Sequence, residues 1–292
     1  MERNQHRDDA GAGAGADPYS RAQYRRLIAW ESRIAREGPF LEELLARAPE
    51  RAVLDIGCGS GEHVAFFAER GARAVGLDRS EAMLADARDH ERRGAGRFVL
   101  GDATRAREAL AGEPPFGLAI SLGNMLPHLR EDQELDALLA EVRALLVPGG
   151  IFLLQILDYE RIVSKNVRAL PVNVRDGEDG EEIVFLRLMR SAGPERILFF
   201  PTTLALDAES EEPVRVVSTR RVELRPWRER DLRPRLERLG FAVTLYGGLC
   251  GGLRGGLCGE PYVAGESQDL VIVAERRDCT TSHGRRMRDD VR

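Results

Sequence analysis

The feature that most constrains this chain is the segment Val-Leu-Asp-Ile-Gly-Cys-Gly-Ser-Gly at residues 53–61. Residues 53–56 form a short apolar run with β-branched side chains, which is typical of a buried strand. Three glycines follow at once, and a glycine turn lets backbone N–H groups approach a bound ligand closely. Residues 63–70 then predict a helix, because their apolar positions share one face. The segment therefore predicts the strand, turn and helix that open a nucleotide-binding α/β domain.

The glycine spacing distinguishes two kinds of nucleotide site. A dinucleotide fingerprint, Gly-x-Gly-x-x-Gly, requires its third glycine at position 62, where this chain has Glu62. The chain instead has Gly57, Gly59 and Gly61, preceded by Asp55. This pattern resembles the first motif of the Rossmann-like S-adenosylmethionine (SAM)-dependent methyltransferases. A glycine pattern alone is weak evidence, so the neighbouring segments have to agree with it.

The following segments repeat the alternation of strand and helix. Residues 74–78 predict a strand that ends in Asp78, an acid placed to accept hydrogen bonds from ribose hydroxyls, and Ser80 is a plausible N-cap of the next helix. A helix at residues 135–146 precedes a Val-Pro-Gly-Gly turn. Three more strands are predicted: one within residues 98–103, which ends in Asp102, and two at residues 116–122 and 151–157. Strands that alternate with helices in this way predict a parallel sheet.

Beyond residue 157 the pattern changes to extended segments separated by turn residues. Three antiparallel strands are predicted, at residues 182–190, 195–206 and 213–224. A helix at 228–239 and strands at 241–246 and 270–275 would complete a seven-stranded sheet with an antiparallel closing hairpin, with a loop at 247–259 between the last two strands. The predicted fold class is therefore α/β, a Rossmann-like seven-stranded methyltransferase sheet with an inserted antiparallel β-meander.

The domain organisation follows from these patterns. Helices are predicted at residues 19–36 and 39–47, before the first strand. The chain divides into a disordered N-terminal segment (1–17), a SAM-binding core with N-terminal helices (18–157), an antiparallel β insertion as substrate lid (158–227), the C-terminal part of the core sheet (228–276) and a disordered tail (277–292).

Composition limits the class of partner. The 292 residues carry a formal charge of −5, whereas nucleic-acid binders usually present a basic face. The sequence shows no apolar run long enough to span a membrane, no secretory h-region near its first residues, and four cysteines without zinc or disulfide spacing. We expect a cytoplasmic protein that acts on a small molecule, without nucleic acid, membrane or metal. Edge strands of the meander could pair between subunits, so a homo-oligomer stays open.

The resemblance implies a set of SAM-binding residues. Asp55 would support the glycine turn and meet the SAM ammonium through water, and Asp78 would hold the ribose hydroxyls. The adenine would pack on Met83 and the Arg79 stem, with Asp102 accepting from its amino group and the Ala103 N–H donating to the ring. The full cofactor-binding set is Tyr24, Arg33, Asp55, Gly57, Gly59, Gly61, Asp78, Arg79, Met83, Asp102, Ala103, Leu122 and His128. For Met83, ordinary core packing is the alternative, and for Asp102 a simple turn acid.

Two further stretches narrow the resemblance. Residues 122–129, Leu-Gly-Asn-Met-Leu-Pro-His-Leu, resemble a segment of the glycine and sarcosine N-methyltransferases. In that family the leucine backbone and the histidine lie beside the methionine portion of SAM, and the asparagine faces the substrate. Trp30-Glu31-Ser32-Arg33 resembles the family's N-terminal helix, whose arginine pairs with the SAM carboxylate. Arg33 could equally be a surface arginine, and His128 a structural histidine.

The resemblance weakens after the fifth predicted strand. The glycine enzymes carry there an arginine that grips the substrate carboxylate, and the matching position in this chain is Leu157. A leucine cannot replace a guanidinium against a carboxylate, which argues against glycine itself. Arg168, Arg187 or Arg190 could take that role. Tyr159 keeps the family's aromatic, which could line the pocket against a cationic amine or sulfonium.

The leading hypothesis is a SAM-dependent methyltransferase that modifies the nitrogen of an amine or amino-acid-like substrate. The candidate catalytic residues are Asn124, His128 and Tyr159, with His128 placed more as a SAM contact than as a base. O- or C-methylation of a natural-product intermediate is one alternative. A non-catalytic SAM-binding regulator is another, because a cradle for SAM does not by itself show that a nucleophile is accommodated.

Overall fold

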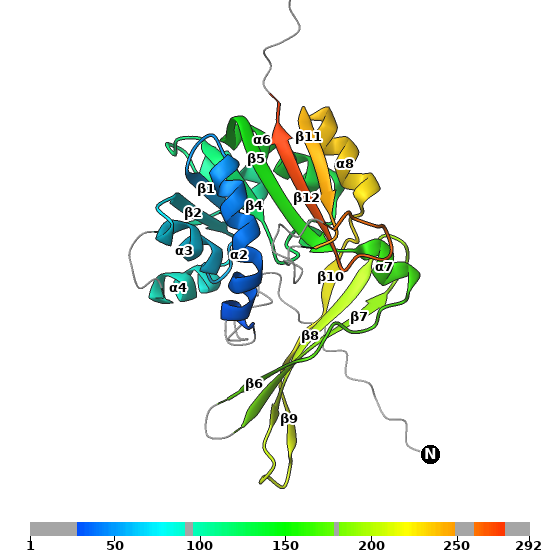
Figure 1. The fold of residues 1–292 in the computed structure, drawn as a ribbon. Helices are drawn as coiled ribbons and strands as arrows, with labels where there is room; N and C mark the ends of the chain where they lie inside the picture. Colours follow the sequence, from blue (N-terminus) through cyan, green and yellow to red (C-terminus); the bar gives the residue numbers. More distant parts are fainter. Residues whose placement is uncertain (1–27, 91–95, 178–180, 249–259, 278–292) are drawn as a thin grey trace, which may run out of the picture.

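A twisted seven-stranded sheet forms the centre of the molecule (Figure 1). The computed structural model describes residues 28–90, 96–177, 181–248 and 260–277. The strand order is β3-β2-β1-β4-β5-β12-β11, with β12 antiparallel to β5 and β11 antiparallel to β12. The strand bounds are β1 (Ala52–Ile56), β2 (Arg73–Asp78), β3 (Gly96–Leu100), β4 (Phe116–Ser121), β5 (Leu146–Leu157), β11 (Phe241–Tyr246) and β12 (Asp269–Arg276). The predicted seven-stranded α/β sheet with an antiparallel closing hairpin is confirmed.

Helices cover both faces of the sheet, so its central strands read as continuous apolar runs. One face packs on α2 (Trp30–Arg47), α3 (Glu62–Glu69) and α4 (Glu81–His90), through a core that includes Leu41, Phe67 and Leu84. The other face packs on α6 (Asp132–Leu145) and α8 (Glu229–Arg238), and the short elements η1 (Ala103–Arg105), α5 (Ala106–Ala109), η2 (Leu126–His128) and α7 (Tyr159–Ser164) complete the fold.

One continuous helix, α2, replaces the predicted break between residues 36 and 39. Pro39 lies inside the helix and removes one backbone donor, yet the helix continues to Arg47. Buried side chains on both sides of the proline hold it together, from Glu37 to Leu45, and a Cβ at Gly38 would lie only 3.2 Å from the Phe66 ring of α3. Tertiary packing therefore overrides the local helix-breaking signal.

Two predicted strand boundaries are also corrected. β3 ends at Leu100 instead of Asp102, because its partner β2 ends at Asp78, opposite Leu100. β5 begins at Leu146, and the Val-Pro-Gly-Gly turn is a bulge inside it: Leu146 pairs with Phe116, and Ile151 pairs with Leu118. The bulge bends the strand without ending its pairing with β4.

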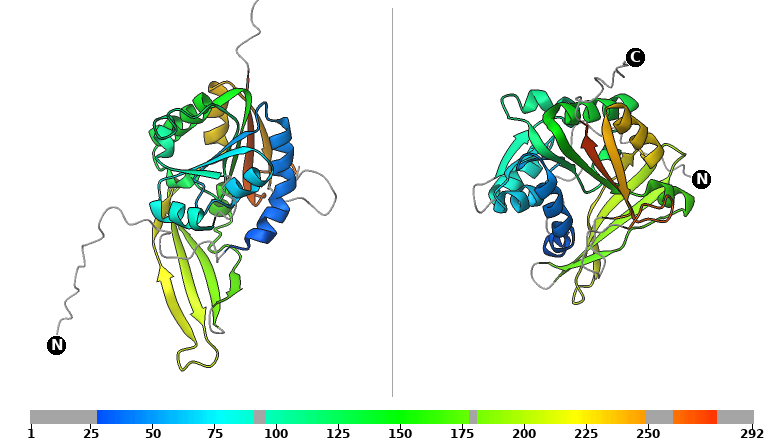
Figure 2. Two further views of the ribbon diagram at one scale, coloured as in Figure 1. Left: turned by 90° about the vertical axis from the view of Figure 1, so that its left-hand side faces the viewer. Right: turned by 45° about the horizontal axis from the view of Figure 1, so that its top comes forward.

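The insertion forms a second antiparallel sheet that projects from the core as an arm (Figures 1 and 2). Its order is β10-β8-β7-β6, with β9 also paired to β8. The strands are β6 (Asn173–Asp176), β7 (Glu182–Ser191), β8 (Ile197–Leu206), β9 (Val214–Thr219) and β10 (Val222–Leu224). The predicted single strand at 213–224 is thus two strands, which pair with opposite halves of β8. β6 is a strand that the sequence pattern did not indicate, because it is only four residues long.

Several sequence expectations concern residues outside the described part of the chain. They are the disorder of residues 1–17 and 278–292, most of the helix at 19–36, and most of the loop at 247–259. Tyr24, a predicted cofactor contact, also lies outside the described residues.

Gly117 offers a test of how tightly the sheet packs on the preceding loop. A Cβ at Gly117 would lie 2.0 Å from the Glu50 carbonyl oxygen and 2.7 Å from the Glu50 nitrogen. Because both neighbours are backbone, we expect Gly117→Ala to lower the free energy of unfolding by about 2 kcal/mol or more in a denaturant titration. Gly71→Ala is the control: a Cβ there has no neighbour within 4 Å, although φ is +75°. The control should lose only about 1 kcal/mol, and equal losses in both variants would contradict the packing argument.

Candidate functional site

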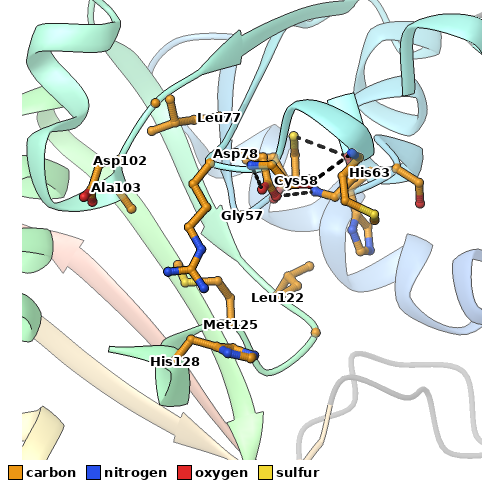
Figure 3. A pocket seen from close by; sticks show the side chains of 18 of the residues that line it. Gly57, Cys58, His63, Leu77, Asp78, Asp102, Ala103, Leu122, Met125 and His128 are labelled. Atoms are coloured by element: carbon orange, nitrogen blue, oxygen red, sulfur yellow. Dashed lines mark hydrogen bonds between the residues drawn. The ribbon is translucent and has the colours of Figure 1, made fainter. Parts of the chain in front are cut away.

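A cavity opens at the carboxyl ends of β1, β2 and β4, where ligands of open α/β sheets bind. Its wall is built from the glycine turn after β1, the end of β2, the loop after β3 and the segment from Leu122 to Leu129. Helix α2 closes one side through Trp30 and Arg33. Figure 3 shows Asp102 and Ala103 at one end of the cavity and His63 at the other, with Asp78 and Gly57 between them. The cavity is therefore elongated, with different chemistry at its two ends.

The glycine turn is fixed to the end of β2 by backbone hydrogen bonds. The Gly57 N–H donates to the Leu77 carbonyl at 2.7 Å, and the Cys58 N–H donates to the same oxygen at 3.2 Å. Gly57 has φ +75°, and a Cβ there would lie 2.5 Å from Met125 Cγ. A side chain at this position would collide with the cavity wall in a backbone conformation that already favours glycine.

Gly61 has a different role from the one predicted. It is not part of the cavity wall, and a Cβ at Gly61 would lie 2.6 Å from the Phe98 ring. Gly61 also takes the N-cap position of α3 with φ +84°. The third glycine of the motif therefore permits close packing of α3 on the sheet, while Gly57 and Gly59 line the cavity.

Asp78 is the acid that the sequence placed at the end of the second strand. Its Oδ2 accepts the Gly59 N–H at 2.8 Å, and its Oδ1 accepts the Ser80 N–H at 2.9 Å. These two donors fix the carboxylate in the cavity wall beside Gly57 (Figure 3). Ser80 caps α4 as predicted, because its Oγ accepts the Met83 N–H at 3.1 Å.

Two buried polar atoms of the wall have no hydrogen-bond partner within the protein. They are Asp55 Oδ2, an acceptor, and Trp30 Nε1, a donor. Both residues line the cavity, and Asp55 is 2% exposed. Burial raises the pKa of Asp55 from 3.8 to about 6, and the Asp78 carboxylate adds to the rise. Buried orphan atoms are costly, so this end of the cavity suits a ligand that brings one donor and one acceptor.

Arg33 comes from α2 and also lies in the wall. Its Nε donates to Glu37 Oε1 at 2.8 Å, and the other oxygen of Glu37 lies 2.9 Å from His63 Nε2. His63 lines the cavity as well. Sequence reasoning missed Glu37 and His63. The four-residue spacing of Arg33 and Glu37 was a usable signal, but nothing in the sequence brings His63 to Glu37.

The residues that the resemblance assigns to the adenine all lie in the wall at the other end of the cavity: Arg79, Met83, Asp102 and Ala103. Asp102 Oδ1 accepts from the Thr104 N–H at 2.8 Å and from the Thr104 hydroxyl at 2.7 Å. Burial alone would raise the pKa of Asp102, but these hydrogen bonds and the charge of Arg105 outweigh it, so the pKa lies below its usual value. Asp102 is therefore an ionised acceptor at this end.

His128 lies in the wall with Leu122 and Met125 (Figure 3). Burial, and then the positive charge of Arg79, lower the pKa of His128 to about 4. The imidazole is consequently uncharged near neutral pH. A neutral ring can lie beside a cationic ligand without charge repulsion, which fits the predicted cofactor contact better than a cationic partner would.

Asn124 and Tyr159 are brought together, but not into the cavity wall. Asn124, at φ +67°, donates from Nδ2 to the Tyr159 hydroxyl at 2.9 Å, and its Oδ1 accepts the Leu157 N–H at 3.1 Å. Tyr159 is 1% exposed, and burial raises the pKa of its hydroxyl. The ring that was expected to face a cationic ligand instead packs in the core, because its hydroxyl ties the start of α7 to the turn after β4.

A second link connects the cavity wall to the end of the sheet. Gln155 Oε1 accepts the Gly123 N–H at 2.9 Å, and Gln155 Nε2 donates to Asp269 Oδ1 at 3.0 Å. Burial raises the pKa of Asp269 to about 6. Asp269 pairs across the strands with Leu157, the residue that stands where the glycine enzymes have an arginine. The residue opposite Leu157 in this part of the sheet therefore carries a carboxyl group, not a guanidinium.

Comparison with known proteins agrees with this geometry. Residues 53–150 match the model of a family described as a methyltransferase domain. The chain carries a class I SAM-dependent methyltransferase domain. The match covers the glycine turn, Asp78, Asp102 and His128, so the family and cofactor that the sequence predicted are confirmed for this domain.

Two curated relatives and one solved structure show the range of similarity. The chain is 34% identical over 163 residues to a glycine/sarcosine N-methyltransferase of Parasynechococcus marenigrum (54% of this chain, 57% of that one). It is 37% identical over 121 residues to a trans-aconitate 2-methyltransferase of Delftia acidovorans (40% and 42%). The chain thus spans about half the length of these curated relatives. The sugar N-methyltransferase KedS8 from Streptoalloteichus has the same fold, with a TM-score of 0.66, 19% identity and coverage of 95% and 100%.

The residues of the cavity fit SAM. The amino-acid portion of SAM brings an ammonium donor and a carboxylate acceptor, the two groups that Asp55 Oδ2 and Trp30 Nε1 lack. Gly57 and Gly59 leave the space that a Cβ would fill. The described residues contain no group of three or more potential metal ligands, and none of the described helices could cross a bilayer.

Asp55 should make the ligand-free methyltransferase domain less stable at high pH. The pKa of the Asp55 carboxyl group is higher in the folded protein, about 6, than in the unfolded chain. Folding therefore costs no extra free energy while Asp55 is protonated in both states, at low pH. As the pH rises above the pKa of the unfolded chain and through about 6, Asp55 becomes ionised in the folded protein and the free energy of unfolding falls. We expect Asp55→Asn to raise the free energy of unfolding by about 2 kcal/mol near pH 8 and to change it little near pH 4. Denaturant titrations at both pH values measure this.

Asp102→Asn is the matched control, because the Asp102 pKa is shifted in the opposite direction. That variant should gain no stability at high pH. A gain for Asp55→Asn that is independent of pH would contradict the burial argument.

Proposed function

We propose that this protein transfers the methyl group of SAM to the nitrogen of a small-molecule amine. The observation that carries the proposal is the cavity at the strand ends, whose wall contains the carboxylates of Asp55, Asp78 and Asp102. The domain match and the glycine/sarcosine and sugar N-methyltransferases among the similar proteins support the same chemistry.

The residues of the chain would bind and orient the cofactor by complementary charge. Asp78, held by the Gly59 and Ser80 N–H groups, is oriented to accept from ribose hydroxyls. Asp102 and the apolar Met83 and Ala103 would hold the adenine end. Asp55 and Arg33 would meet the ammonium and carboxylate of the amino-acid end. When bound, SAM supplies a methyl group on a sulfonium, an electrophile that needs only an aligned nucleophile.

The neutral His128 and the apolar Leu122 and Met125 would surround the reacting region. Their contribution is to exclude water and to hold the acceptor in line with the methyl group. An amine must also lose a proton. Asp269, which is linked to the wall residue Gly123 through Gln155, would attract the amine before that proton is lost. The arm formed by β6 to β10 would cover the substrate side as a lid.

We infer that the methyl acceptor is an amine that carries no carboxylate group, such as an amino sugar. Leu157 packs against the core, where the glycine enzymes have an arginine. Of the three arginines considered as substitutes, Arg168 and Arg187 donate to the backbone oxygens of Met189 and Pro171. Similarity to the sugar N-methyltransferase KedS8 extends over 95% of the chain, including the arm, whereas the glycine/sarcosine relative matches 54%.

Methylation of a carboxylate oxygen is the second candidate. The trans-aconitate 2-methyltransferase of Delftia acidovorans is as similar over the core as the glycine/sarcosine enzyme is. Such a substrate would need cationic partners near the reacting methyl group. The Asp269 carboxylate would repel it, so the amine is favoured.

The first test of the proposal is calorimetric titration with SAM and S-adenosylhomocysteine. We expect binding of both by the wild-type protein. Asp78→Ala should weaken binding by at least about tenfold, because it removes a charged acceptor for two ribose hydroxyls. Circular dichroism of the variant checks that it is folded. If the folded wild-type protein binds neither ligand, the methyltransferase proposal fails.

The second test addresses the acceptor through the release of S-adenosylhomocysteine. Glycine, sarcosine, amino sugars and nucleotide-linked amino sugars would be compared with trans-aconitate. We expect turnover with an amino sugar and none with glycine or sarcosine, because Leu157 offers no carboxylate grip. Efficient turnover of glycine would contradict the argument from Leu157. Binding of SAM without turnover of any acceptor would favour the non-catalytic regulator.

A further inference from the structure

Arg33, Glu37 and His63 are joined by hydrogen bonds at one end of the cavity. Arg33 and Glu37 lie one turn apart on the same face of α2, and His63 lies on the first turn of α3. Glu37 Oε1 accepts from Arg33 Nε at 2.8 Å, and Glu37 Oε2 lies 2.9 Å from His63 Nε2. Glu37 and His63 are 7% and 5% exposed. A carboxylate buried to this degree in direct contact with two partners holds both of them in place.

The ionisation of the three groups is consistent with this arrangement. Burial alone would raise the pKa of Glu37, but the hydrogen bond with His63 and the charge of Arg33 outweigh it, so the pKa lies below its usual value. Glu37 is therefore a carboxylate at neutral pH and accepts hydrogen bonds at both oxygens. His63 then carries its proton on Nε2.

The direction of the Arg33 guanidinium follows from the contact at Nε. With Nε directed to Glu37, the terminal nitrogens are directed to the turn after β4: a Cβ at Gly123 would lie 3.7 Å from Nη1 and 3.9 Å from Nη2. The guanidinium carbon also lies 4.9 Å from the centre of the Trp30 ring, and that ring meets His63 edge to face at 5.6 Å. The guanidinium is thus restrained from two sides, and its two-nitrogen end is presented at the cavity.

To bind a zwitterionic ligand, the protein needs one cationic and one anionic side chain that do not form an ion pair with each other. Asp55, the nearby anion of the wall, keeps Oδ2 without a hydrogen-bond partner in the protein, although Arg33 lies close enough to lower its pKa. Glu37, which is not among the residues that line the cavity, supplies Arg33 with a different carboxylate. Arg33 is thus held by Glu37, while Asp55 keeps an oxygen for a ligand, and a carboxylate and an ammonium on one ligand would complement the two charges.

We propose that Glu37 and His63 are positioning residues that hold Arg33 apart from Asp55, so that the two charges bind the carboxylate and the ammonium of the amino-acid portion of SAM. This inference rests on the proposed function. The three residues form a relay from His63 through Glu37 to Arg33, in which only Arg33 contacts the cofactor carboxylate.

The relay predicts an effect that depends on which part of the cofactor a ligand contains. S-adenosylhomocysteine carries the amino-acid portion, whereas 5′-methylthioadenosine lacks it and keeps the adenosine and the sulfur. We expect Glu37→Gln to weaken binding of S-adenosylhomocysteine about tenfold in calorimetric titrations and to leave binding of 5′-methylthioadenosine unchanged. Unchanged binding of 5′-methylthioadenosine also shows that the variant is folded.

A double-mutant cycle separates positioning from an independent contribution of Glu37. Arg33→Ala should weaken S-adenosylhomocysteine at least as much as Glu37→Gln, and the double variant should be no weaker than Arg33→Ala alone. His63→Gln should reproduce a smaller part of the Glu37→Gln effect. The matched control is Glu31→Gln, which removes the same charge from an exposed position on the same helix and should bind both ligands as the wild type does.

Each alternative result has a distinct meaning. If Glu37→Gln weakened the binding of both ligands equally, Glu37 would only hold α2 against α3. That result would overturn the relay. Additive losses in the double variant would also overturn it, because Glu37 would then act without Arg33. Failure of the wild-type protein to bind S-adenosylhomocysteine would instead overturn the proposed function on which the relay rests.

Discussion

The attachment of the glycine turn to the end of β2 is the interaction on which the rest of the site depends. The Gly57 and Cys58 N–H groups both donate to the Leu77 carbonyl, and the Gly59 N–H donates to the Asp78 carboxylate. These bonds hold two neighbouring strands at a fixed separation at their carboxyl ends, and they orient Asp78 in the same step. Without these bonds, the glycine turn and the Asp78 carboxylate would both lose their fixed positions in the cavity wall.

The two ends of the cavity differ in their charged groups and in the pKa values of their carboxyl groups. Near α2, the buried Asp55 keeps an unpartnered oxygen, while Arg33 is restrained by Glu37. Near η1, Asp102 is exposed and ionised and serves as the N-cap of that turn. At the buried end, the raised pKa of Asp55 means that its ionised form lowers the stability of the ligand-free protein. Such a cost is typical of a site prepared for a ligand that compensates it.

The antiparallel arm gives the fold a second surface beside the parallel core. β7 and β8 pair over ten residues, and their bases join the core through Met189, Ile197 and Leu224. The arm begins after β5, near the strand ends where Leu157 and Asp269 pair (Figure 1). It therefore lies beside the position at which we expect the substrate.

The sequence alone determined the order of elements in the core sheet. The glycine spacing, the acid after the second strand and the apolar periodicity are local signals, so the sheet, the glycine turn and Asp78 could be predicted from residues close together in the chain. The cofactor contacts of Asp55, Met83 and Asp102 were expected only from the family resemblance. Even so, local signals misplaced the break in α2, because the gain from burying its apolar face exceeds the loss of one hydrogen bond at Pro39.

Only the tertiary structure decided which side chains meet across the chain. It placed Gly61 against Phe98 instead of in the cavity, joined Asn124 to Tyr159 in the core, and brought His63 to Glu37 over a separation of 26 residues. The physical reason is that such contacts depend on how helices pack on the sheet. Packing is set by the shapes of many side chains at once, and no single spacing in the sequence records it.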